Sequence, residues 1–380
     1  MIAMASVIRR FEAEFFAQYA ARTLPSQRVA LAALKLCRTQ LAPHMLAQCG
    51  GCGEQQLVPH SCGHRHCPHC QHHESQRWTR RQLAAQVPAR YFMLTFTLPA
   101  ELRALAWRHQ SGVYGALLDC AWATVNEFSR NDKKLRGTPG AVAVLHTHSR
   151  RLDYHPHVHL MMPAAALGDD RKLGRKKLWR VKCAASQNEA DKPYLFNHKA
   201  LAKVFRAKLL AALAEQGLSL PASVPKTWVV DCRAVGSGAK ALIYLGRYLY
   251  RGVIQEKDIL HCEDGQVTFR YCDAASGKML LRTVSGAAFL WMVLQHVLPK
   301  GFRRARNFGF LHPNSKRLIR LLQWVLKLAV FALQKPTPPR PAWLCACCGQ
   351  PMQIVRRRIA PAQAPLARPR QPAQAASAMQ

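Results

Sequence analysis

The sequence predicts an α+β protein whose core is an antiparallel sheet with the element order β-α-β-β-α-β. Short runs rich in β-branched and aromatic residues, such as RYFMLTFTL at 90–98, alternate with longer stretches in which apolar residues recur at helical spacing. Two strands follow each other without a helix between them, which is typical of a split antiparallel arrangement with helices on one side. A small helical, cysteine-rich module is expected before this core, and a helical region after it.

The individual elements follow from the same two patterns. Residues 7–47 are expected to be helical, because apolar residues recur there at helical spacing. The core strands are expected at 90–98, 141–148, 154–162 and 226–233, with helices at 100–130 and 198–216 between them. Later helices are expected at 237–252, 286–298 and 314–334, and short strands between 253 and 284. A proline-rich linker then leads to a basic tail from about residue 360 that is too poor in apolar residues to fold.

Charge is the outlying feature of the composition. Among 380 residues, 55 are Lys or Arg and 20 are Asp or Glu, giving a net charge of +35 and a pI near 10.4. Such an excess repels itself unless a polyanion is close, so nucleic acid is the expected partner. A membrane is excluded, because the most apolar segment, residues 321–333, is short and carries Gln323 and Lys327.

Cysteine usage indicates the compartment. The amino-terminal residues lack the apolar core and cleavage site of a secretory signal. The 14 cysteines are therefore expected in a reducing cytoplasm, where clustered thiols bind metal more often than they form disulfides.

Two C-x-x-C pairs lie close together in CGGCGEQQLVPHSCGHRHCPHC. Cys49 and Cys52 form the first pair, and Cys67 and Cys70 the second. Two such pairs across a short polar loop predict a structural Zn²⁺ site, with a redox C-x-x-C as the weaker alternative. Further ligand candidates are Cys62, His64, His66 and His69. A third C-x-x-C at 345–348 has no second pair nearby in the sequence, so it predicts a metal site only weakly.

Three histidines alternate along the expected strand at 154–162. Alternate side chains of a strand share a face, so His155, His157 and His159 are expected to point the same way. Histidine is a poor filler for a strand face and a common metal ligand, which favours a metal site over an exposed basic cluster. His155 is the nearest third ligand, with His146 and His148 on the preceding strand as the others. Pro156 indicates an edge strand or a bulge.

Two tyrosines and a set of basic residues complete the candidate site. Tyr244 and Tyr248 lie one turn apart on the helix expected at 237–252, and on that stretch alone core packing would explain them. The segment LPKGFRRARNFGF alternates arginines with aromatics, which suits either contact with nucleic acid or a buried hairpin with outward-facing arginines. The candidate DNA-binding residues are Arg303, Arg304, Arg306, Lys240 and Arg247.

These parts together suit phosphodiester chemistry. A divalent cation on His157 and His159 would polarise a phosphate, and a tyrosine would attack it to give a 5′-phosphotyrosine link and a free 3′-hydroxyl. Mg²⁺ or Mn²⁺ fits this chemistry, although imidazole ligands admit other metals.

Five ordered stretches resemble one superfamily. The pattern H-hydrophobic-H followed by Y-x-x-x-Y is similar to that of the HUH endonucleases. The chain also resembles the two-tyrosine rolling-circle transposases of bacterial insertion sequences, the insertion-sequence ninety-one family. The stretches that carry this resemblance are the two cysteine pairs in CGGC…SCGHRHCPHC, then FTLPAELR, HPHVHL, YLGRYLYR and ARNFGFL. The resemblance implies an HUH-type core and a strand transferase acting on single-stranded element ends. It also implies that His157 and His159 are metal ligands, that Tyr244 and Tyr248 are nucleophiles, and that the amino-terminal cysteines bind zinc. Such an enzyme would work at the bacterial nucleoid.

Three other functions remain open. A plasmid or phage rolling-circle replication initiator, or a relaxase, would share the histidines and tyrosines. A metallo-hydrolase would leave the charge unexplained, and a zinc-dependent DNA-binding protein without catalysis would not need the tyrosines. The expected domains are a helical and zinc-binding domain at 1–86, an HUH core at 87–255, an extension of the core at 256–335, and a Pro/Cys segment with a disordered tail at 336–380.

Overall fold

The central sheet follows the predicted order of elements. The structure is a computed structural model that describes residues 2–169, 177–183, 193–250, 252–273, 276–327 and 343–360. Within these residues the core strands are β3 (Tyr91–Thr97), β4 (Thr138–His148), β5 (Tyr154–Pro163) and β8 (Val230–Ala234). They lie in the order β4-β5-β3-β8, and every pairing among them is antiparallel. Helices α4 (Arg103–Arg108) and α5 (Gln110–Asn131) link β3 to β4, and α6 (His198–Glu215) precedes β8, so the β-α-β-β-α-β order is confirmed.

Further strands extend this sheet. On its β4 side the order continues to β6 (Ala165–Asp169) and β7 (Lys177–Val181), while β12 (Ala305–Gly309) pairs with β4 along another stretch. The histidine strand β5 lies between β3 and β4, near the middle of the sheet. Pro156 is accommodated there by a bulge, because the register shifts between His146 and His148 of β4, which pair with His157 and Tyr154. The expected bulge is therefore in an interior strand.

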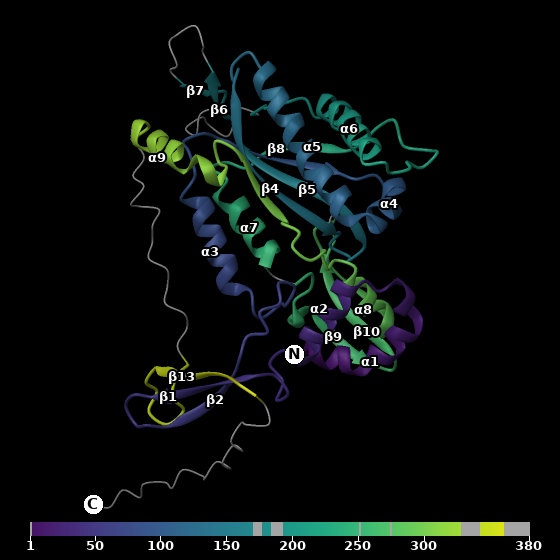
Figure 1. The fold of residues 1–380 in the computed structure, drawn as a ribbon, viewed down its shortest axis with the longest axis vertical. Coiled ribbons are helices and arrows are strands. Elements are labelled where there is room, and N and C mark those ends of the chain that lie inside the picture. The colour runs from purple at the N-terminus through teal and green to yellow at the C-terminus, as the bar shows by residue number, and fades with distance from the viewer. Residues whose placement is uncertain are drawn as a thin grey trace, which may run out of the picture.

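The two faces of the sheet pack against different helices (Figure 1). Leu94, Val158 and Leu160 face α5 and α6 in the largest apolar core. Met93 and Met161, whose side chains point the other way, face α7 (Ala239–Tyr250), α3 (His72–Leu83) and α9 (Lys316–Val325). Helices thus cover both faces, and the expectation of helices on one side was wrong. Beyond the bulge, His157, His159 and Met161 of β5 lie on the face that α7 covers, which brings the histidine face to the tyrosine helix.

A second core joins the start of the chain to residues far along it. Helices α1 (Met4–Tyr19) and α2 (Pro25–Leu36) pack with α8 (Gly286–Leu294), and β9 (Ile259–Glu263), β10 (Gln266–Cys272) and β11 (Met279–Ser285) form a sheet beside them. Glu256 ties the two parts together by accepting a hydrogen bond from the Met4 amide at 2.7 Å. The packing of residues therefore crosses the expected boundaries at 86 and 256, although the division into separable domains stays a prediction.

The helical stretch expected at 7–47 ends early. Helix α2 stops at Leu36, Arg38 adopts a positive φ of 57°, and Pro43 precedes a strand, β1 (His44–Cys49). Strand β1 pairs with β2 (Gln55–Pro59) and with β13 (Met352–Ile359), a strand from the far end of the chain. Figure 1 shows this small sheet at the end of the molecule away from α5 and α6. The expected linker and the tail beyond residue 360 lie outside the described residues.

Candidate active site and zinc sites

Three imidazoles converge on the face of the sheet that α7 covers. His157 and His159 lie on β5, and His146 lies opposite them on β4. Their ligand atoms all lie within 4.8 Å of one another. The pleat explains the convergence: residues two apart on β5 share a face, and His146 pairs directly with His157 across the ladder.

The hydrogen bonds of these rings leave one nitrogen of each available. His157 Nδ1 lies 2.7 Å from the His155 carbonyl oxygen, and His159 Nδ1 lies 3.0 Å from Thr95 Oγ1. A carbonyl at Nδ1 requires the proton there, so the Nε2 lone pair of His157 is free to bind a metal. His146 Nε2 is buried and has no hydrogen-bond partner among the residues that the structure describes. A metal ion would satisfy this orphaned nitrogen, so the three residues fit a divalent cation.

Burial keeps the three rings neutral. It is the main cause that lowers the pKa of His157 to about 3 and that of His159 to about 4, with a smaller contribution from His159 in the first case and from Arg233 in the second. Burial also holds the pKa of His146 well below its usual range. Neutral imidazole is the form that binds metal.

His155, expected as the third ligand, lies outside this group. Its Nδ1 accepts a hydrogen bond from Arg103 at 2.7 Å, so this nitrogen is occupied by an arginine of α4. The bulge at Pro156 interrupts the regular alternation between His155 and His157. His146 takes the place that we expected for His155. His148, the other candidate, lies next to His296 and Tyr248 instead.

The two tyrosines of α7 differ in exposure. The ring of Tyr248 stacks on His146 with centroids 3.3 Å apart, and the Thr147 amide donates to its hydroxyl at 3.4 Å. The ring of Tyr244 lies 6.4 Å from that of His146, and its side chain is 53% exposed. Burial raises the pKa of Tyr248, while the charge of Arg304 opposes that effect. Both tyrosines lie on the side of the sheet that bears the histidines.

Close packing against α3 fixes the position of α7. Gly246 lies between the two tyrosines, and a Cβ there would clash with the Thr79 hydroxyl and lie 3.1 Å from the Trp78 ring. The Ser75 hydroxyl donates to the Gly246 carbonyl at 2.7 Å. Only glycine permits this approach of the two helices, which sets the rings of Tyr244 and Tyr248 over the sheet.

The five basic residues expected to bind DNA have different environments. Lys240, Arg247 and Arg303 are exposed, whereas Arg306 is paired with Asp119 at 2.8 Å. Arg304 is 8% exposed, and its guanidinium carbon lies 5.7 Å from the centre of the Tyr248 ring. Within the described part of the chain, its Nε and Nη2 have no hydrogen-bond partner. Arg304 therefore belongs to the tyrosine site rather than to the surface.

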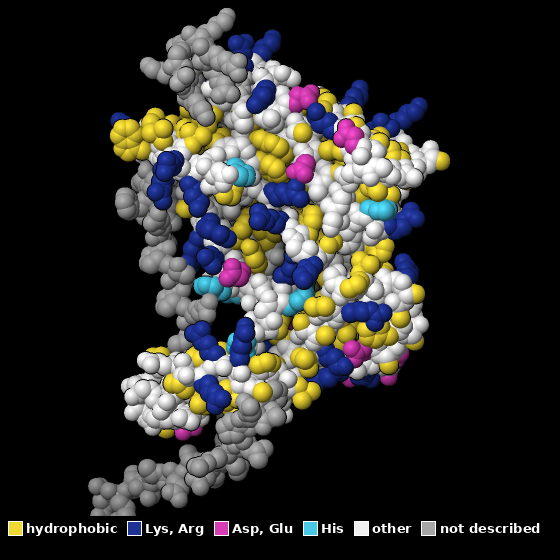
Figure 2. All heavy atoms as spheres, in the orientation of Figure 1, with side chains coloured by type: hydrophobic (Ala, Val, Ile, Leu, Met, Phe, Trp, Pro, Cys, Tyr) yellow, Lys and Arg dark blue, Asp and Glu magenta, His cyan; other side chains and the backbone are white. Residues whose placement is uncertain are grey.

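The aromatics of the same segment are packed into the protein. Phe308 stacks on Trp122, and Phe310 is buried against Trp179. The segment forms β12 and its flanks, so the structure supports the buried alternative for these rings. Basic side chains do gather nearby: a groove of about 1130 Å³ beside α3, β12 and α9 is lined by Arg81, Arg303, Arg306, Lys316 and Arg320 among others. Figure 2 shows Lys and Arg side chains over the face that carries α3 and α7.

The expected zinc ligands do not form one site. Cys67 and Cys70 lie with Cys37 and Cys62, whereas Cys49 and Cys52 lie with Cys345 and Cys348. The reason is β2, whose five residues run extended between the two expected pairs and span about 17 Å. The assignment of Cys49, Cys52, Cys67 and Cys70 to one ion was therefore wrong.

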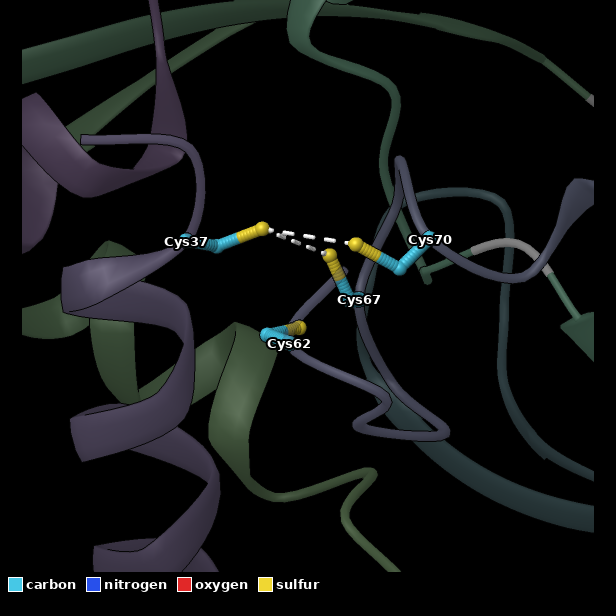
Figure 3. Close-up of side chains that lie close together, drawn as sticks. All are labelled: Cys37, Cys62, Cys67 and Cys70. Atoms are coloured by element: carbon cyan, nitrogen blue, oxygen red, sulfur yellow. Dashed lines mark hydrogen bonds between the residues drawn. The ribbon is translucent and has the colours of Figure 1, made fainter. Parts of the chain in front are cut away.

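The first cysteine group joins α2 to the loop that follows β2. The sulfur of Cys37, at the end of α2, lies 3.5 Å from those of Cys67 and Cys70, and Figure 3 shows all four sulfurs turned toward one another. Four thiolates in one cluster are a usual ligand set for structural zinc. The spacing in sequence gave no sign of Cys37, which follows a helix 25 residues before Cys62.

Comparisons with known proteins match this chain to transposases. Residues 7–98 match the family model described as "Transposase zinc-binding domain", and residues 140–318 match the one described as "Putative transposase". A "Putative transposase y4qJ" of Sinorhizobium fredii is 30% identical over 332 residues, covering 81% of this chain and 80% of that protein. The "Transposase for insertion sequence element IS801" of Pseudomonas savastanoi is 27% identical over 293 residues, covering 72% of this chain and 68% of that protein.

A zinc module, a basic surface and a trio of imidazoles facing two tyrosines define a DNA-processing enzyme, and the comparisons identify its class as transposase. The chain belongs to the insertion-sequence ninety-one family of transposases. A solved structure, the conjugative relaxase TrwC in complex with mutant OriT DNA, is 14% identical over 62% of this chain and 72% of that one, with a TM-score of 0.25, a likeness too weak to bear on the fold. In the part of the chain that the structure describes, no helix has the length and apolar content to cross a bilayer.

Proposed function

We propose that this transposase cuts and rejoins single-stranded DNA through a covalent 5′-phosphotyrosine intermediate, in a rolling-circle type of transposition. The observation that carries the proposal is the meeting of two elements. His146, His157 and His159 converge on one face of the sheet, and the rings of Tyr248 and Tyr244 lie 3.3 Å and 6.4 Å from that of His146.

The three histidines would hold Mg²⁺ or Mn²⁺. A bound divalent cation would polarise the phosphate and stabilise the charge that develops on its oxygens. Three neutral imidazoles also suit other first-row metals. Thr95 and the His155 carbonyl would orient His159 and His157 for this purpose.

The chemical step belongs to the tyrosines. A phenolate oxygen attacks phosphorus, the new bond joins tyrosine to the 5′ side of the break, and the bond from phosphorus to the 3′ oxygen breaks. The phenol gives up its proton, and the departing oxygen takes one up to become a 3′-hydroxyl. One phosphate ester replaces another, so the strand can be rejoined without ATP. Two tyrosines permit two successive transfers while the DNA stays attached.

The basic surface supports DNA as the substrate. With a net charge of +35, the chain would release many counterions on binding DNA, so its affinity should fall steeply with salt. Exposed Lys240, Arg247 and Arg303 would contact phosphates, and the enzyme would act at the bacterial nucleoid. A replication initiator or relaxase would use the same chemistry, but membership of the transposase family favours transposition.

Adduct formation tests the proposal. The full chain is incubated with a labelled single-stranded oligonucleotide from an element end and Mn²⁺, and the products are resolved on a denaturing gel. We expect a DNA–protein adduct and a free 3′-hydroxyl fragment, both lost in the double variant Tyr244→Phe/Tyr248→Phe and on chelation. An adduct that persists in the double variant would refute the assignment of the nucleophiles. DNA binding without cleavage in any metal would favour the non-catalytic alternative.

A further inference from the structure

Two cysteine pairs from opposite parts of the chain meet around one point. Cys49 is the last residue of β1 and Cys52 lies in the turn after it, and Cys345 and Cys348 lie before β13. The sulfur of Cys49 is 3.4 Å from that of Cys348, and the sulfur of Cys52 is 3.5 Å from that of Cys345. All four lie within 4.8 Å of one another. Sulfurs bound tetrahedrally at about 2.3 Å from zinc are about 3.8 Å apart, so the four are spaced to hold one ion.

The two pairs have the same backbone geometry. Each has the sequence C-x-x-C-G, and its glycine adopts a positive φ, 74° at Gly53 and 73° at Gly349. In each turn this glycine amide donates to the carbonyl of the first cysteine, at 3.1 Å in one and 2.9 Å in the other. The amide of that first cysteine donates at 2.8 Å to a carbonyl five residues later, on Glu54 or Gln350. Two matched turns that present their sulfurs to each other are the form of a zinc knuckle pair.

The surrounding core is too small to hold this unit together by itself. Its buried residues are Ala47, Cys49, Val58, Cys345 and Met352. A core of this size falls well short of what a stable domain needs, and small units of this kind usually depend on a metal or a disulfide. The four cysteines are free thiols, and the sulfurs that face each other come from different turns.

We propose that Cys49, Cys52, Cys345 and Cys348 form a second tetrathiolate zinc site, which closes a zinc ribbon made from the two ends of the chain. The zinc-binding family model matches residues 7–98 and so contains only half of these ligands. The metal would hold β13 against β1. These two strands pair from Cys49↔Met352 to His44↔Ile359. The exposed arginines at 356–358 would then be carried on a folded strand beside the β1–β2 hairpin.

Cobalt substitution of the full chain tests the proposal. Thiolate-bound Co²⁺ has a sulfur-to-metal charge-transfer absorption that an all-histidine site lacks, so the active-site trio does not enter the count. We expect two thiolate-bound cobalt ions per chain in the parent protein and one in Cys345→Ser/Cys348→Ser. Cys37→Ser/Cys67→Ser should also bind one, and the combination of all four substitutions none.

Cys347→Ser is the matched control, because Cys347 lies between two ligands but is not among the four that converge. It should keep both ions. Retention of two ions by Cys345→Ser/Cys348→Ser, or loss of one by Cys347→Ser, would overturn the proposal. A readout independent of the variants is hydrogen exchange in the parent protein: removal of the metal should speed exchange of the β1 and β13 amides, and unchanged exchange would also refute it.

Discussion

The imidazole of His146 lies face to face with the phenol ring of Tyr248, with centroids 3.3 Å apart and planes inclined by 11°. His146 is also the member of the imidazole trio that comes from β4, while Tyr248 comes from α7, about 100 residues later in the chain. The residue that completes the candidate metal site therefore also positions a candidate nucleophile. Loss of its ring should affect both.

His146→Asn should weaken Mn²⁺ binding by more than the 10–100-fold that the loss of an outer-shell partner costs, because it removes a ligand itself. Titration of the full chain with Mn²⁺, followed by electron paramagnetic resonance of the free ion, measures this affinity. His155→Asn is the control, since Nδ1 of His155 accepts a hydrogen bond from Arg103. Equal losses in the two variants would show that His155 is a ligand after all.

Tyr244 should form the first adduct. Its side chain is 53% exposed, whereas burial raises the pKa of Tyr248 and so disfavours the phenolate form. In a single-turnover assay, Tyr244→Phe should reduce the initial rate of adduct formation at least about tenfold, and Tyr248→Phe should leave it within about twofold, differences of about 1.4 and 0.4 kcal/mol in the barrier. Tyr250→Phe, on the same helix, should have no effect. If the first adduct maps to Tyr248, the two tyrosines react in the opposite order.

Arg304 should set the pH dependence of Tyr248. Its positive charge lowers the pKa of that phenol, against the larger effect of burial. Arg304→Gln removes the cation, so the pKa of Tyr248 should rise and the reaction of Tyr248 should need a higher pH. In a Tyr244→Phe background, the rate-pH profile of the remaining tyrosine should move toward alkaline pH. Arg306→Gln is the control, because Arg306 is paired with Asp119. If the rate-pH profile does not move in Arg304→Gln, Arg304 does not affect the ionisation of Tyr248.

Strand β5 and helix α7, which carry the candidate site, could be predicted because their signals are local. Alternation along residues 154–162 places His157 and His159 on one face, and a spacing of four places Tyr244 and Tyr248 on one side of a helix. The choice of His146 over His155 needed the register of β4 against β5 and the bulge at Pro156, which a single strand does not reveal. Those long-range features decide which of several candidate ligands meet.

The prediction of the cysteine ligand sets was wrong for the same physical reason. Pairing the two C-x-x-C motifs nearest in sequence assumed that short separation means contact, but β2 carries them apart. Cys37 sits at the end of a helix, and Cys345 lies 293 residues from Cys52, its neighbour in space. Contacts of that separation depend on the whole fold and have no sequence periodicity. The packing of Phe308 on Trp122 and the burial of Phe310 could likewise not be predicted, because they depend on the pairing of β12 with β4.

Acid should destabilise the fold in part through His296. This residue is 1% exposed, and its Nε2 lies 3.1 Å from the Leu152 carbonyl oxygen. Its buried Nδ1 has no hydrogen-bond partner in the ranges that the structure describes. Burial holds its pKa well below the usual value, which is about 6.5 in an unfolded chain. The unfolded state therefore binds a proton below pH 6.5 that the folded state does not.

The sign follows from this difference. The contribution of His296 to stability is complete above pH 6.5 and is lost as the pH falls below that value, by up to about 1.4 kcal/mol for each pH unit. Urea unfolding at pH 7.5, 6.5 and 5.5 should show a falling free energy of unfolding. The fall should be smaller in His296→Gln, which has no group to titrate, and unchanged in His198→Gln, whose side chain is exposed at the start of α6. An equal fall in all three proteins would mean that other groups account for the acid sensitivity.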